Sequence, residues 1–232
     1  MFPAWLVTVM LMFGTPAAAL AERSDVQVLA DQIDSEWAEA FYNVPEDQKV
    51  PRLKELLVRA QKFRERFPKR AEPLILEAIV LCSLAGVDWG MNSLAQIEQS
   101  RDLLIKSIDI DPRAMDAAAY ITLGNFYFRL PGWPLSFGDD RQARQYLQSA
   151  VMLFPDAIDS NYFMGDFLLD QGEYAAALPH LEKAEHAPVR PYQRVSDNKL
   201  KEQLPALLTA ARNKGDGGGD FFSGLLPDFG SP

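Results

Sequence analysis

Few side chains in this chain of 232 residues have the types and the spacing that metal binding requires. His180 and His186 are its only histidines and stand six residues apart, whereas two imidazoles that share one zinc ion on a helix stand four apart. A weak metal site that adds neighbouring glutamates is a minor alternative. We predict no metal ligand and no cofactor.

Two carboxyl groups have a spacing that could serve acid and base catalysis. Asp166 and Asp170 stand one helical turn apart, although this spacing more often marks a solvated or partner-facing stripe. The sequence contains no Gly-x-Ser-x-Gly motif, no glycine-rich phosphate loop before a helix, and no cysteine and histidine placed for nucleophilic attack. We therefore predict no catalytic residue and a protein that is not an enzyme.

The charge balance argues against two classes of partner. Asp and Glu number 32 and Lys and Arg 23, which gives a formal net charge of -9 at pH 7. An acidic chain without a basic stripe is a poor ligand for nucleic acid or for anionic lipid. Residues 51–67 are the local exception and present either a solvated basic face or a contact for an acidic partner, made of Arg52, Lys54, Arg59, Lys62, Arg64 and Arg66.

The first 21 residues have the pattern of a signal peptide. An apolar run over residues 1–13 precedes small residues at 17–21, in the arrangement that signal peptidase accepts. We predict cleavage after Ala21, export to the periplasm and no membrane span in the mature chain, with an uncleaved anchor as the alternative. The single cysteine, Cys82, lies in an apolar segment and is predicted to be a buried thiol.

The spacing of apolar residues predicts a chain built from helices. These residues recur at steps of three and four, as on one helix face, and no segment alternates convincingly with the period of two of a strand. The predicted helical domain is 22–212, and the Gly-rich tail 213–232 is either disordered or a short docking peptide. The predicted helices cover residues 24–42, 51–67, 72–84, 93–108, 113–129, 141–154, 159–171 and 174–185, with a last helix from Ser196 or Asp197 to about Arg212.

Successive helix pairs share a pattern of small residues and a closing proline. Gly124 on one pair corresponds to Gly165 on the next, and each is followed by two alanines seven residues apart on the second helix. Tetratricopeptide repeats have this pattern, because their two helices approach closely at small residues. We predict an all-α, tetratricopeptide-like solenoid of helical hairpins with elongated loops between helix A and helix B and a C-terminal capping helix. The closing prolines are Pro68, Pro112, Pro155 and Pro188.

The elongated loops are apolar, and insertions in a solenoid gather on one face. Segment 129–140 holds two prolines and two glycines within nine residues, which excludes a helix there. Segment 85–92 is the second such loop. Packing of the loop aromatics onto the core is an equal alternative to partner contact. The predicted partner- or ligand-binding residues are Trp89, Met91, Trp133, Phe137, Tyr162 and Asp166.

The three stretches 130–140, 143–155 and 159–169 resemble the TatT family, the periplasmic T components found beside TRAP transporters. The resemblance covers about residues 119–208. It implies an all-helical periplasmic protein that associates with the substrate-binding protein of a transporter. Some members of the family are trimers with a hydrophobic channel that admits a small apolar ligand, and the resemblance extends this expectation to the present chain.

Two functions follow as expectations. The first is a non-enzymatic periplasmic scaffold or adaptor that binds another periplasmic protein through its concave face and inserted loops, and the resemblance implies the substrate-binding protein of a TRAP-type transporter as that partner. The alternative is a carrier of a small apolar ligand in a channel that the inserted loops line. Assembly into a homo-oligomer is compatible with either function.

Overall fold

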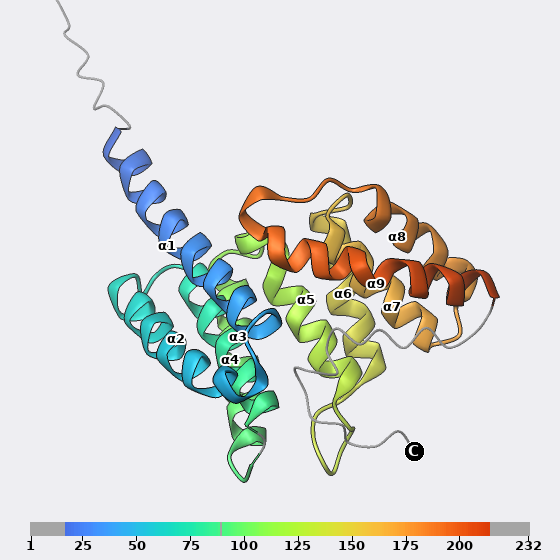
Figure 1. Cartoon of the computed structure of the whole chain (residues 1–232), viewed down its shortest axis with the longest axis horizontal. Coiled ribbons are helices and arrows are strands. Elements are labelled where there is room, and N and C mark those ends of the chain that lie inside the picture. The colour runs from blue at the N-terminus through green and yellow to red at the C-terminus, as the bar shows by residue number, and fades with distance from the viewer. Residues whose placement is uncertain (1–16, 89, 214–232) are drawn as a thin grey trace, which may run out of the picture.

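The computed structural model describes residues 17–88 and 90–213, and every regular element in these ranges is helical (Figure 1). The all-α prediction is confirmed for this part of the chain. The predicted signal peptide and the Gly-rich tail lie wholly or largely outside it and stay predictions. The helices are α1 Ala17–Tyr42, α2 Glu46–Arg66, α3 Glu72–Val87, α4 Ser93–Ile110, α5 Ala114–Arg129, α6 Asp140–Leu153, α7 Ile158–Asp170, α8 Tyr174–His186 and α9 Arg194–Asn213, with a 3-10 turn η1 at Pro191–Gln193.

Three helix starts differ from the sequence-based prediction. Helix α1 begins at Ala17, ahead of the predicted start at Ser24. Helix α2 begins at Glu46, ahead of the predicted start near Pro51, because Glu46 and Asp47 place negative charge in its first turn and favour the helix there. Helix α9 begins at Arg194, and Asp197 does not cap it. The carboxylate of Asp197 instead accepts a hydrogen bond from the backbone amide of Arg190.

Helix ends elsewhere follow the sequence signals. The carboxylate of Asp139 accepts hydrogen bonds from the amides of Arg141 and Gln142 and so caps α6, as predicted. Gly172 ends α7 with φ +71, a conformation that glycine adopts without a Cβ penalty. None of the helices in the described ranges is long and apolar enough to cross a membrane.

The helices form two layers. Each helix packs against the next one in the chain, and the odd-numbered helices also pack against one another in the order α1, α3, α5, α7 and α9. Helix α9 lies across the hairpins in Figure 1 and contacts α1 as well as α7. The five odd helices therefore close into a ring, and the even helices α2, α4, α6 and α8 lie outside it.

Close approach within two hairpins depends on glycine. A Cβ added to Gly124 of α5 would lie 2.6 Å from Leu147 Cγ of α6, and one added to Gly165 of α7 would lie 2.6 Å from Leu181 Cδ2 of α8. Both leucines are fully buried. Helices α5 and α6, and likewise α7 and α8, thus approach each other at a position without a side chain, as the repeat pattern predicted.

Alanine at either glycine should lower stability. We expect Gly124→Ala and Gly165→Ala each to lower the free energy of unfolding by about 1 to 3 kcal/mol, because the added methyl group forces the facing leucine out of place. Chemical denaturation followed by circular dichroism measures the change. Gly90→Ala is the control, since its Cβ would meet no atom closer than 3.9 Å and should leave stability nearly unchanged. Equal stability of all three variants would contradict close packing at the two glycines.

Helix α5 begins with a left-handed turn that the sequence does not indicate. Met115, Asp116 and Ala117 have φ of 49, 55 and 63, a region that residues with a Cβ adopt at a cost of about 1 to 3 kcal/mol each. Two side chains far along the chain hold the turn. Arg190 and the Tyr192 hydroxyl both donate to the carboxylate of Asp116, at 2.8 and 2.7 Å.

Candidate functional site

The inserted loop between α5 and α6 has a buried side and an exposed side. On the buried side, the Phe137 ring packs edge-on against Tyr127 at a centroid distance of 5.3 Å, and the Arg101 guanidinium of α4 lies 4.7 Å from the Phe137 ring. Backbone bonds close the loop, from the Gly138 amide to the Pro131 carbonyl and from the Asp139 amide to the Tyr127 carbonyl. Phe137 therefore attaches the loop to the helices.

The exposed side of this loop is apolar. The side chains of Trp133 and Leu135 retain 90% and 72% of their accessible surface. Met91, in the α3–α4 loop, is fully exposed, and both loops project from the same end of the helical array in Figure 1. Exposed large apolar side chains on neighbouring loops are typical of a surface that another molecule covers.

The other predicted site residues lie elsewhere. Tyr162 is fully buried in α7, where its hydroxyl pairs with Gln203 of α9. Asp166 is also buried, and Arg129 at the end of α5 binds its carboxylate. Trp89 lies outside the described residues. The structure thus brings Met91 and Trp133 to one end of the molecule and places Tyr162 and Asp166 inside it.

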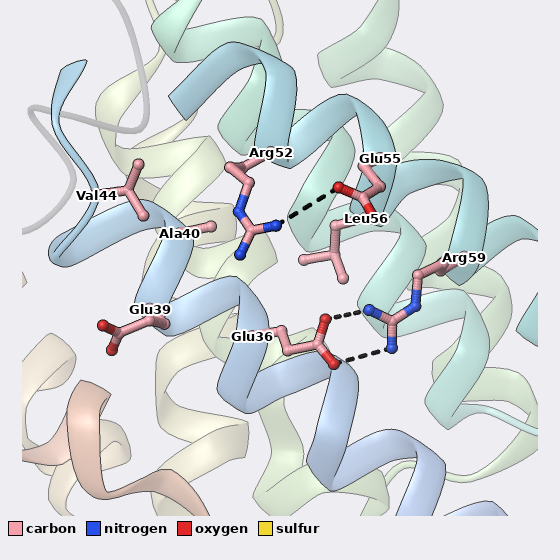
Figure 2. Close-up of a pocket in the computed structure, with 8 residues that line it drawn as sticks. All are labelled: Glu36, Glu39, Ala40, Val44, Arg52, Glu55, Leu56 and Arg59. Carbon is pink, nitrogen blue, oxygen red and sulfur yellow. Dashed lines mark hydrogen bonds and ion pairs between the residues drawn. The ribbon is translucent and has the colours of Figure 1, made fainter. Parts of the chain in front are cut away.

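A surface hollow of about 150 Å³ lies between α1 and α2 (Figure 2). Arg59 forms two hydrogen bonds with Glu36 across it, and Arg52 lies 3.6 Å from Glu55. The carboxylate of Glu39 points away from both guanidinium groups in Figure 2. The predicted basic face is therefore partly neutralised by the chain's own carboxylates, which favours its interpretation as a solvated surface.

A second hollow, of about 80 Å³, is lined by residues from all five odd helices. Apolar side chains form most of its wall, and each odd helix supplies at least one of them. They are Trp37 from α1, Cys82 from α3, Ile121 from α5, Phe163 from α7 and Leu200 from α9. Sequence analysis did not identify this ring cavity, because its lining residues are spread over more than 160 positions of the chain.

Arg190 organises the polar end of the ring cavity. Its guanidinium and backbone amide bind three carboxylates, with Nη1 2.8 Å from Asp116, Nη2 3.0 Å from Asp159 and 2.7 Å from Asp197. Asp197 is fully buried, and Asp159 is nearly so. Burial raises the pKa of Asp159, but Asp116 and Asp197 alone already outnumber the one cation, so the cluster keeps an excess of negative charge.

A fourth carboxyl group, that of Asp34, has a different environment. Its side chain is buried, Gln193 is its hydrogen-bond partner, and Arg190 acts on it only at longer range. Burial raises the pKa of Asp34 to about 7, and the nearby charges of Asp31 and Asp159 contribute to the rise. Asp34 therefore changes its charge close to neutral pH.

The cysteine and the two histidines are less suited to chemistry. Burial raises the pKa of the Cys82 thiol to about 12, which makes it unreactive and confirms the predicted buried thiol. The ring nitrogen Nδ1 of His180 pairs with Asn161, and that of His186 pairs with the Glu182 carbonyl. In residues 17–88 and 90–213, no three His, Cys, Asp or Glu side chains form a cluster that could hold a metal ion.

The two aspartates that could have paired for catalysis do not meet. Asp166 is buried and bound by Arg129, whereas Asp170 is exposed and accepts a hydrogen bond from Gln171.

No protein-family model matches this sequence, and a search of curated proteins finds no match.

Proposed function

We propose that this chain is a non-enzymatic periplasmic scaffold that binds a partner protein through the end of the array where the two inserted loops project. The exposed Trp133 carries the proposal, because an aromatic side chain with 90% of its surface in water is a costly feature in a molecule without a partner. Leu135 in the same loop and Met91 in the α3–α4 loop are exposed as well. We call these three residues the loop surface.

The same proposal assigns the helical hairpins to the tetratricopeptide repeat type. Gly124 opposite Leu147 and Gly165 opposite Leu181 support hairpins of the tetratricopeptide type, since that repeat places a small residue where its two helices meet. The resemblance of segment 130–140 to TatT proteins suggests the substrate-binding protein of a TRAP-type transporter as the partner. Export through the predicted signal peptide would bring this chain into the compartment of that partner.

The alternative, carriage of a small apolar ligand in a channel lined by the inserted loops, has less support. Met91 and Trp133 are exposed to solvent, and the hollow with mostly apolar walls is the ring cavity, to which neither contributes. Helix α9 also packs against α7, α8 and α1 and so occupies part of the inner side of the array. A partner therefore meets the loop surface more readily than the inside of the array.

Capture of the partner from periplasmic extract of the native host tests the proposal. We expect Trp133→Ala combined with Leu135→Ala to lose the co-purifying protein while the melting temperature stays within about 2 °C, since exposed side chains contribute little to stability. Phe137→Ala is the matched control from the same loop. It should lower the melting temperature by several degrees, because its ring packs on Tyr127.

Two outcomes would remove the proposal. Retention of the same partner by the double variant would show that the loop surface does not bind it. A change in the molar mass of the double variant in light scattering, without any loss of partner, would assign the loop surface to contact between copies of this chain.

A further inference from the structure

The ring cavity has unsatisfied polar groups as well as apolar walls. Gln193 Oε1 and Ser196 Oγ are shielded from solvent, line the ring cavity and have no hydrogen-bond partner among the described residues. Buried polar atoms in folded proteins nearly always have a partner, either protein or an enclosed molecule. The two atoms are thus available to hydrogen-bond a molecule that enters the ring cavity.

Asp34 lies beside these two atoms and is the carboxyl group that Arg190 does not bind directly. Asp34 and Gln193 also line a second, outer hollow of about 240 Å³, together with Tyr192. The two side chains therefore stand at the junction of an inner apolar space and an outer polar one. A molecule at this junction would contact Asp34 with its polar end and the ring of helices with its apolar end.

The charged side chains near the ring cavity favour a ligand with a positive charge. Asp116, Asp159 and Asp197 outnumber Arg190, whose guanidinium is already engaged by all three. The other cation nearby, Arg194, lines the outer hollow. An anionic ligand would meet repulsion, and a neutral hydrocarbon would leave Gln193 Oε1 and Ser196 Oγ without a hydrogen-bond partner. A primary ammonium group carries three donors and one positive charge, which matches three acceptors and the excess of negative charge.

We propose that the ring cavity binds a small primary ammonium compound, with its nitrogen at Asp34, Gln193 and Ser196 and a short aliphatic chain among Trp37, Ile121 and Phe163. The volume sets the length of that chain. A cavity of about 150 Å³ accommodates benzene, so a space of about 80 Å³ accommodates roughly three or four carbon atoms. A longer or polar substituent on the ligand extends into the outer hollow.

Isothermal titration with isobutylammonium tests this site, with isobutanol and isobutyrate as probes of the same shape and different charge. We expect isobutylammonium to bind to the full chain with a dissociation constant in the millimolar range or below, and the other two probes to bind at least tenfold more weakly. Binding should strengthen between pH 6 and pH 8, as Asp34 loses its proton in the field of Asp31, Asp159 and Arg190.

Variants of the two ends of the ring cavity complete the test. Asp34→Asn should weaken binding of isobutylammonium at least tenfold, and Ala118→Leu, which fills the apolar end, should abolish it. Asp25→Asn is the control, an exposed carboxyl group on the same helix that should bind as the parent does. The proposal is overturned if isobutanol binds as well as isobutylammonium, if Asp34→Asn binds unchanged, or if no probe binds because water alone fills the ring cavity.

Discussion

Replacing Arg190 by methionine should lower the free energy of unfolding at pH 8 by about 3 to 5 kcal/mol, because the substitution leaves buried carboxylates without their counter-ion. Asp197 is fully buried and receives hydrogen bonds from the backbone amide and the guanidinium of Arg190. Asp159 loses its ion pair at the same time. Urea denaturation at pH 8 measures the loss.

The loss should be smaller at low pH. Protonation neutralises the unpaired carboxyl groups of the variant, so its deficit in stability should shrink between pH 8 and pH 5. Arg212→Met is the control, since Arg212 pairs with Glu182 at the surface and should change stability by less than about 1 kcal/mol. A deficit of Arg190→Met no larger than that of the control would show that Arg190 does not stabilise the cluster.

Replacing Asp34 by asparagine should stabilise the protein above neutral pH. The folded chain holds the Asp34 proton up to a pKa of about 7, whereas the unfolded chain releases it near the ordinary value of 3.8. The contribution of Asp34 to the free energy of unfolding is therefore largest below pH 4, falls as the pH rises towards 7 and stays low above it. The full difference is at most about 4 kcal/mol.

Thermal denaturation at several pH values measures this effect. We expect Asp34→Asn to melt up to about 10 °C above the parent chain at pH 8, and the two melting temperatures to converge at pH 4. Asp25→Asn, on the exposed side of α1, should follow the parent at every pH. A constant difference between Asp34→Asn and the parent would mean that burial does not shift the Asp34 titration. The same substitution removes the carboxylate of the proposed ammonium site, so the gain in stability should accompany a loss of binding.

Local sequence signals were sufficient to predict the helical hairpins. Apolar residues spaced three and four positions apart located each helix, and Gly124 and Gly165 marked where the helices touch. Both signals lie within one helix or two neighbouring helices. Asp139 and Gly172 marked helix ends for the same reason. These features depend on residues that are close together in the chain.

The ring cavity and the Arg190 cluster depend on distant residues, and sequence analysis did not find them. Arg190 lies in the segment after α8 that sequence reasoning treats as a connection, and its partner Asp116 is 74 residues away. Periodicity reports which face of a helix is apolar, but it does not report which distant side chain meets that face. Asp34 did leave a signal, since it stands four residues after Ala30 and three before Trp37, on the buried face of α1.

The contact between α1 and α9 affects how the molecule unfolds. In an array open at both ends, terminal repeats fray independently and stability grows with repeat number. Here Arg190 and Tyr192 tie the segment before α9 to α5, and the cavity residues of α9 meet those of α1. Detachment of either end would expose buried carboxylates, so we expect the described helices to unfold as one cooperative unit.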